Sequence, residues 1–376
     1  MISDNESEGI AMMAKKERQS NIELLRILAI MGVIILHYNN PVIGGGIAYA
    51  QKGSLNFYIL YGLESVFICA VDLFILISGY FMCESKRRNL WKPIELIVQV
   101  MLFNEAIYLM RAALHTVPFS IKSAVMALIP ANYFVILYCV VFLISPFLNV
   151  LIEELSEKSF RTFVLLSVLL FSVVATVVDV LGELRGQEFK GLSTVGLYGS
   201  QWGYSIVNFI LMYLIGAYLR KGKSKIVEWE IRKLCLCLIA DVALIVVWAR
   251  VNDKTGFFAE RSAWEYCNPL IIFEAVIIFI LFGRINLGIN KVINGLAEGA
   301  FSVFLLHQVF IPHLQIKKFV TGNTILMLLH IHGCAIIIYL LCWCVHKVYH
   351  LITDPIFNRF SSKHMIMLDV ESNTGD

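Results

Sequence analysis

Apolar segments of membrane-spanning length recur along the whole sequence, and no other feature restricts the fold as strongly. A helix rises ~1.5 Å per residue, so ~20 mostly apolar residues are needed to cross a bilayer. The stretch at residues 20–38, SNIELLRILAIMGVIILHY, meets that length. Apolar residues make up 58% of the chain and charged residues 16%, whereas soluble proteins average about 45–50% and 25%. The runs are continuous rather than alternating, which excludes a β-barrel, so the sequence predicts an all-α, polytopic helical membrane protein.

About ten transmembrane helices are predicted, and an even number places both termini on the same side of the membrane. The predicted spans are 22–39, 57–82, 91–113, 131–150, 161–181, 203–220, 232–251, 269–283, 297–314 and 324–350. The first run is longer than the apolar region of a signal peptide and contains Arg26 and His37, so we expect an uncleaved first span. The predicted organisation is a disordered tail at 1–20, one transmembrane domain at 21–352 and a C-terminal tail at 353–376.

Lysine and arginine are distributed unevenly between the two predicted sides of the membrane. The side that holds the termini is the richer one, with basic clusters at 15–18, 86–92 and 220–225. Cytoplasmic loops are enriched in these residues, so we expect both tails to be cytoplasmic. The first helix then runs outward, with Arg26 near the cytoplasm and His37 near the exterior.

Arg26 and His37 are eleven positions apart in the first predicted span. On an ideal helix this spacing is three turns plus about 20°, with an axial separation of about 16 Å, so the two side chains share one face. A charge inside a bilayer costs at least ~2.5 kcal/mol on insertion scales, and such residues therefore face the interior of a bundle. We expect Arg26 and His37 to line a common cavity, where an elongated anionic molecule could contact both.

Arg26 has two interpretations from the residues alone. It can be structural, either reaching the cytoplasmic interface or pairing with Asp72. Its guanidinium can instead bind the phosphates of an anionic cytoplasmic cofactor, because a guanidinium matches phosphate geometry.

The segment that contains Asp72, VDLFILISGYFM at 71–82, also has two interpretations. Ser78 and Gly79 allow close helix packing. Alternatively, this helix end and the basic loop that follows form an entry site for a phosphorylated cofactor, with Lys86, Arg87 and Arg88 as its cations.

Other polar residues in the predicted spans mark the bundle interior, namely Glu64, Asn104, Glu105, Asp241, Glu274 and His307. His307 can orient its neighbours, line the cavity or take part in chemistry. The nine cysteines show no C-x-x-C or Cys/His spacing, so we interpret them as apolar filler and expect no metal site. The net charge of +3 forms no basic stripe, and we expect no nucleic-acid partner.

Several segments together resemble the membrane-bound acyltransferase family 3, the integral-membrane O-acyltransferases that modify bacterial surface polysaccharides and related acceptors. The similar segments are the R-x10-H pattern of Arg26 and His37, then VDLFILISGYFM at 71–82, YFVILYCVVFLISPFLN at 133–149, FILMYLIGAYLRK at 209–221, NPLIIFEAVIIFILF at 268–282 and FSVFLLHQ at 301–308. They occur in the family's order and cover essentially the whole chain, from about 18 to 350.

The resemblance implies transfer of an acyl group, usually acetyl from acetyl-CoA, to a hydroxyl of a glycan on the far side of the membrane. Carried over by motif, Arg26 and His37 match the functional arginine and histidine of the family, and motif positions of less certain role are Asp72, Ser78, Gly79, Tyr80 and His307. We expect His37 to act as a general base on the acceptor, with a transient acyl-histidine as the second possibility. The implied location is the bacterial cytoplasmic membrane, as a multi-pass protein.

Three other functions fit a polytopic chain with buried polar residues. A transporter or flippase for a lipid-linked glycan would use Arg26 and His37 as substrate contacts without covalent chemistry. A polysaccharide polymerase or ligase would tend to carry a large external loop, and the longest expected here is about 20 residues. A sensor that has lost activity would have less reason to retain both Arg26 and His37. The sequence leaves the acceptor, the acyl group and the oligomeric state open.

Overall fold

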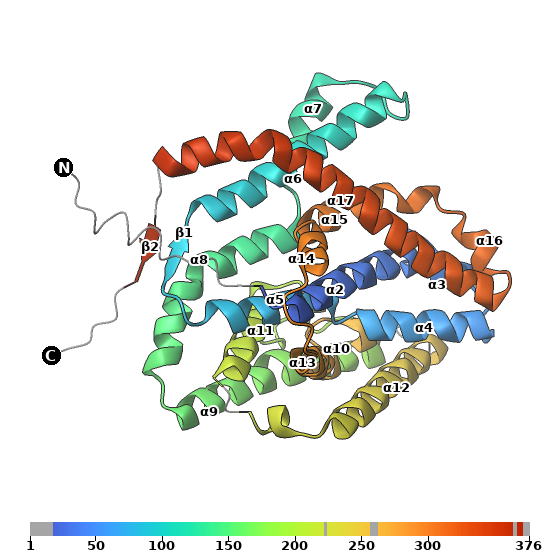
Figure 1. Ribbon diagram of the computed structural model, residues 1–376. Helices are drawn as coiled ribbons and strands as arrows, with labels where there is room; N and C mark the ends of the chain where they lie inside the picture. Colours follow the sequence, from blue (N-terminus) through green and yellow to red (C-terminus); the bar gives the residue numbers. More distant parts are fainter. Residues whose placement is uncertain (1–17, 222–223, 256–261, 364–366, 371–376) are drawn as a thin grey trace, which may run out of the picture.

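The computed structural model describes residues 18–221, 224–255, 262–363 and 367–370 as a bundle of helices (Figure 1). Within these ranges nine helical segments are long and apolar enough to cross a membrane. They are Ser20–Asn39, Leu55–Met82, Trp91–Ala113, Tyr133–Glu154, Glu157–Arg185, Ile231–Lys254, Ser262–Gly283, Lys291–Val309 and Thr324–Phe357, with Ile206–Arg220 as a shorter apolar helix. The predicted all-α, polytopic fold is therefore confirmed, and each predicted span matches one of these segments.

In chain order the α-helices are α2 Ser20–Asn39, α3 Gly46–Tyr49, α4 Leu55–Phe67, α5 Ala70–Met82, α6 Trp91–Ala113, α7 Ile121–Ala127, α8 Tyr133–Glu154, α9 Glu157–Val168, α10 Val174–Arg185, α11 Ile206–Arg220, α12 Ile231–Thr255, α13 Pro269–Gly283, α14 Lys291–Ala297, α15 Ala300–Leu306, α16 Ile316–Val320 and α17 Thr324–Lys363. A π-helical turn, Leu169–Val173, joins α9 to α10. Short 3₁₀ helices lie at Gln201–Gly203, Lys225–Glu228, Ser262–Trp264, His307–Val309 and Ile311–His313.

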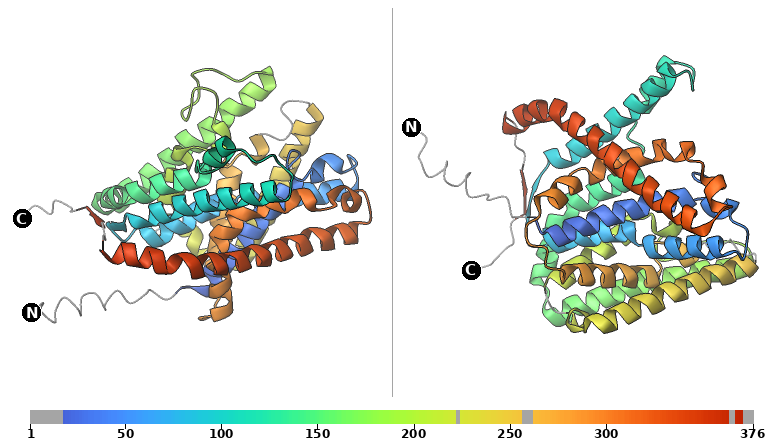
Figure 2. Two further views of the ribbon diagram at one scale, coloured as in Figure 1. Left: turned by 90° about the horizontal axis from the view of Figure 1, so that it is seen from above. Right: turned by 45° about the vertical axis from the view of Figure 1, so that its right-hand side comes forward.

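Helix α2 lies inside the bundle and α17 at its surface (Figure 2). About two thirds of the α2 span is buried, at 67%, against 33% for the α17 span. α2 packs against α4, α5, α13, α14, α15 and α17. A helix surrounded in this way can hold polar side chains out of contact with lipid, which is where α2 places Arg26 and His37.

Helices α5 and α11 make the closest pair in the bundle, because two glycines let their backbones touch. A Cβ added at Gly79 would lie 2.2 Å from the carbonyl oxygen of Tyr213, and one added at Gly216 would lie 2.1 Å from that of Leu76. Small residues serve this purpose in membrane helix pairs. The packing interpretation of Gly79 therefore agrees with the structure.

Two of the predicted continuous spans are broken in the structure. The span predicted at 57–82 consists of α4 and α5, which meet at Ile68 and Cys69. The span predicted at 297–314 consists of α15 and two 3₁₀ helices, His307–Val309 and Ile311–His313. α14 precedes α15 in the same membrane-crossing segment. Where a helix is interrupted, backbone N–H and C=O groups lose their partners within the helix. At membrane depth such groups must be buried inside the protein rather than exposed to lipid.

The predicted tails are partly ordered. Residues 1–17 of the tail predicted to be disordered lie outside the described residues, and α2 begins at Ser20. At the other end, α17 continues past residue 352 to Lys363. Strand β2, Met367–Asp369, then pairs antiparallel with β1, Arg87–Asn89. The C-terminal segment therefore covers the basic loop that follows α5.

The α5–α11 contact gives a stability prediction. We expect Gly216→Ala to lower the stability of the protein by about 1–3 kcal/mol, because the new methyl group forces two backbones apart. The thermal unfolding midpoint of the detergent-purified protein measures this. The matched control is Gly62→Ala in α4, where no atom lies within 4 Å of the added Cβ. Equal midpoints for the two variants would contradict the close-packing explanation.

Candidate functional site

One face of α2 runs past two cavities. Arg26 and Ile30 line the first, and Val33 and His37 line the second. Their spacing of four, three and four residues follows one side of a helix. The shared face expected for Arg26 and His37 thus agrees with the structure.

The second cavity, which we call the His37 cavity, has a volume of about 560 Å³. Besides His37, its polar and aromatic lining consists of Asn40, Glu64, Asn104, Arg111, Asn132, Tyr133, Tyr204, Tyr266, Phe304 and Gln308. Three tyrosines of this set are in ring contact, with centroid distances of 4.5 Å for Tyr133–Tyr204 and 5.0 Å for Tyr204–Tyr266. Burial raises the pKa of Tyr204, so its phenol stays protonated and can donate a hydrogen bond. Aromatic faces beside amide and charged groups suit a molecule with both apolar faces and hydroxyls.

His37 and His307 form a pair at this cavity. Nδ1 of His37 lies 2.5 Å from Nε2 of His307, and the two rings are nearly parallel, at 7°. His307 is fully buried and does not line the cavity, whereas His37 is half-buried and does. His37 is thus the member of the pair that a ligand can reach.

The backbone assigns the tautomers of both rings. Nδ1 of His307 lies 3.0 Å from the carbonyl oxygen of Val303, which can only accept, so this nitrogen carries the proton and donates. A neutral imidazole has one N–H, so Nε2 of His307 is an acceptor and receives its hydrogen bond from Nδ1–H of His37. Nε2 of His37 is then left with a free lone pair. A free imidazole nitrogen at a cavity wall can take a proton from a bound hydroxyl.

His307 lies directly after the C-terminal end of α15. The Val303 carbonyl accepts the backbone N–H of His307, as in a continuing helix, and also the hydrogen bond from Nδ1 of the same residue. His37 occupies the last turn of α2. The pair thus joins two helix ends that are 270 residues apart in the chain.

Arg26 lies at the other end of the α2 face, in an ion pair. Its Nη1 is 2.7 Å from Oε1 of Glu23, three residues earlier, and the Arg26 side chain remains 31% exposed. Asp72, the alternative partner considered for Arg26, instead accepts a hydrogen bond of 3.0 Å from Asn208 and is buried. The Arg26–Asp72 pair, one of the alternatives that the sequence left open, is therefore not formed, because Glu23 is nearer on the same helix.

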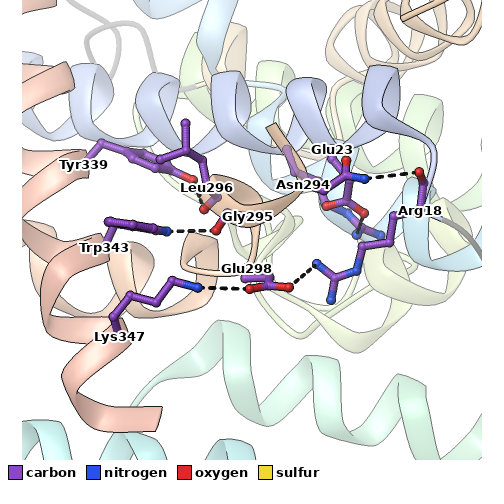
Figure 3. A network of polar contacts seen from close by, with 10 residues as sticks. Arg18, Glu23, Asn294, Gly295, Leu296, Glu298, Tyr339, Trp343 and Lys347 are labelled. Carbon is purple, nitrogen blue, oxygen red and sulfur yellow. Dashed lines mark hydrogen bonds and ion pairs between the residues drawn. The ribbon is translucent and has the colours of Figure 1, made fainter. Parts of the chain in front are cut away.

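The first cavity, which we call the Arg26 cavity, has a volume of about 270 Å³. A larger cavity of about 770 Å³, the Lys347 cavity, adjoins it, since Arg18, Lys92, Leu96, Glu298 and Phe301 line both. Figure 3 shows Glu298 between Arg18 and Lys347, at 3.8 Å and 3.1 Å. The figure also shows Tyr339 and Trp343 of α17 bound to the carbonyls of Leu296 and Gly295. Lys92, the third cation on the wall of the larger cavity, lies 3.6 Å from Glu95. Together the two cavities form a space whose walls carry cations that are paired with carboxylates.

The basic loop after α5 lies away from these cavities. Lys86 is paired with Glu153 at 2.6 Å and Arg87 with Asp369 at 2.8 Å. Arg88 is buried, and it donates to Oγ of Ser145 and to the carbonyls of Met82, Ser85 and Arg87. Burial lowers the pKa of the Arg88 guanidinium. Lys86, Arg87 and Arg88, the predicted cation set, do not line the Arg26 cavity, whereas Lys92 does.

The motif residues of α5 have different surroundings. Ser78 lines the Arg26 cavity and donates to the carbonyl of Phe74. Tyr80 contacts Phe279, and Arg220 lies over its ring. Gly79 is a packing residue. Ser78 and Phe74 of this segment line the cavity that Arg26 also lines, whereas Asp72, Gly79 and Tyr80 do not.

The single cavity expected along α2 is divided in the structure. Arg26 and His37 line different cavities, and Phe304 lines both. The spacing of residues along α2 cannot predict this division, because the division depends on Phe304, an aromatic side chain of a different helix, α15.

Several site residues escaped the sequence analysis. Glu23 could have been found as an acidic residue at i−3 from Arg26. Arg18 was assigned to the tail, although it lies just before α2. The carbonyl of Val303 carries no sequence signal.

A comparison with protein families finds that the model described as "Acyltransferase domain" matches residues 19–347. No curated protein and no solved structure matches the chain. The matched range includes Arg26, His37 and His307.

The Arg88 contacts predict a structural role. Arg88→Ala should lower stability by at least about 1.5–3 kcal/mol, because buried acceptors lose a charged donor. Arg87→Ala is the control and should change stability by about 0–1 kcal/mol, since its ion pair is exposed. Thermal midpoints in detergent compare the two. If Arg88→Ala left the midpoint unchanged, the buried hydrogen bonds would not be what holds the loop.

Proposed function

This chain belongs to acyltransferase family 3, whose domain model covers residues 19–347, and we propose that it transfers an acyl group from acetyl-CoA to a hydroxyl. The acyl group is acetyl by family resemblance, and the hydroxyl belongs to an extracytoplasmic surface or cell-wall glycan. The protein is a multi-pass membrane protein. We place it in the bacterial plasma membrane with both termini in the cytoplasm, which is the orientation that the distribution of lysine and arginine favours. The observation that carries the proposal is the hydrogen-bonded series Val303–His307–His37, which ends in a free nitrogen at a cavity wall.

The acyl donor is assigned to the Lys347 and Arg26 cavities. Coenzyme A carries phosphates at one end and an extended arm that ends in the thioester. Arg18, Lys92 and Lys347 line the larger cavity, and lysine and arginine are the usual phosphate-binding side chains. The narrower Arg26 cavity continues from there along α2 and would receive the arm.

The acceptor is assigned to the His37 cavity. Its three contacting tyrosines offer faces and phenol groups, and Asn104, Asn132 and Gln308 offer amides. A sugar presents both C–H faces and hydroxyls, which is the combination that this lining can bind.

In the reaction, His37 acts as the general base. Nε2 of His37 takes the proton of the acceptor hydroxyl as its oxygen attacks the thioester carbonyl. The new C–O bond forms, the C–S bond breaks, and the proton passes from His37 to the sulfur of the leaving thiolate. A positioned base of this kind typically contributes 10²–10⁴-fold to the rate.

His307 is a positioning residue in this mechanism. It accepts from Nδ1–H of His37, which holds the ring in the tautomer with a free Nε2. When His37 gains its proton, the same hydrogen bond becomes charge-assisted and stronger. Transition-state charge is thus stabilised by a group that was already in place.

The dyad is tested by acetyl transfer to the endogenous glycan in membrane vesicles. We expect His37→Ala to lower kcat by about 10²–10⁴-fold. His307→Leu should lower kcat with little change in the KM for acetyl-CoA, whereas His307→Gln, whose amide oxygen can still accept, should recover part of the rate. Activity of His37→Ala close to wild type would remove the mechanism. Equal losses for His307→Leu and His307→Gln would argue against a positioning role.

The donor site is tested with two lysines of the same basic segment. Lys92→Ala should raise the KM for acetyl-CoA about fivefold to tenfold, which corresponds to ~1–1.4 kcal/mol for the loss of one phosphate contact. Lys86→Ala is the matched control, because Lys86 lines neither the Arg26 cavity nor the Lys347 cavity, and the KM of this variant should stay at the wild-type value. If Lys86→Ala raised the KM for acetyl-CoA and Lys92→Ala did not, the donor-binding site would instead lie at the loop after α5.

A further inference from the structure

The Arg26 and His37 cavities lie end to end along the same helices. On α2 the lining passes from Ile30 to Val33, and on α5 from Phe74 to Val71. On α8, Phe134 lines the Arg26 cavity and Tyr133 lines the His37 cavity. The two spaces are therefore successive parts of one path that is interrupted at this level.

Aromatic rings fill the interruption. Phe134 packs on Phe304 with a centroid distance of 4.9 Å and on Phe74 at 6.2 Å. Phe304 is also in contact with His307, at 6.3 Å between ring centroids. Its ring thus lies between the Arg26 cavity and the histidine pair.

Phe304 differs from the other two rings of this layer because it lines both cavities. Phe134 is buried, at 9% exposed. Phe74 is half-buried like Phe304, but it lines the Arg26 cavity and not the His37 cavity. The Phe304 ring has open space on either side, so a change of rotamer can open the path without moving a helix. Such side-chain rotations are fast compared with enzyme turnover.

We propose that the side chain of Phe304 closes the passage between the two cavities and limits the size of the acyl group that reaches His37. This inference rests on the proposed acyl transfer and adds a specificity-determining residue to it. The acyl group leads the thioester through the passage, so each added methylene must pass the ring and then lie against it. A pocket that discriminates by shape separates substrates that differ by one methylene by about 10–200-fold.

The test measures chain-length preference in membrane vesicles whose cytoplasmic face is outward. Labelled acetyl-CoA and butyryl-CoA are supplied separately, and alkali-labile acyl esters on the endogenous glycan are quantified. In Phe304→Ala the ratio of butyryl to acetyl kcat/KM should rise at least about tenfold over wild type. Phe304→Leu keeps an apolar side chain and should give a smaller rise in the same direction.

The matched control is Phe301→Ala, three residues earlier on α15. Phe301 lines the Arg26 and Lys347 cavities but not the His37 cavity, so its removal should leave the ratio unchanged. An unchanged ratio in both Phe304 variants that still transfer acetyl would overturn the inference, as would an equal rise in Phe301→Ala. Wild-type vesicles that transfer no acyl group would instead refute the proposed function itself.

Discussion

The hydrocarbon core of a membrane supplies no water, so each polar side chain within a span needs a partner from the protein. In this bundle three pairs of polar residues meet that requirement. Arg26 binds Glu23 on its own helix, Asp72 binds Asn208 of α11, and His37 binds His307. The first pair needs only a helical turn, whereas the other two require that separate helices pack in one arrangement. The helix packing that gives these polar groups their partners is therefore also the packing that forms the site.

The histidine pair depends on the place where α15 ends. The Val303 carbonyl accepts both the backbone N–H of His307 and the hydrogen bond from its Nδ1. The second bond selects the tautomer of His307 and, through it, that of His37. One backbone carbonyl thus determines which nitrogen of His37 carries the proton. Close packing of α5 on α11, made possible by Gly79 and Gly216, provides a rigid support on another side of α2.

Charge and aromatic character are separated along the path beside α2. The Lys347 and Arg26 cavities carry guanidinium and ammonium groups together with carboxylates, and the His37 cavity carries mainly tyrosines and amides, with Glu64 and Arg111. Phenylalanines lie between them. A donor with an anionic head and a slender arm and an acceptor rich in hydroxyls would each meet the part of the path that suits it.

The sequence alone determined the class of fold, the positions of the spans and the shared face of Arg26 and His37, because hydrophobic length and helix period act within one helix. Its motifs also indicated the family. The tertiary structure decided which residues meet: His307 with His37, Glu23 rather than Asp72 with Arg26, and Lys92 rather than the 86–88 loop at the Arg26 cavity. It also placed Phe304 between two cavities where one was expected. Contacts between helices that lie up to 270 residues apart depend on how side chains pack across the bundle, and no spacing along a single helix encodes that.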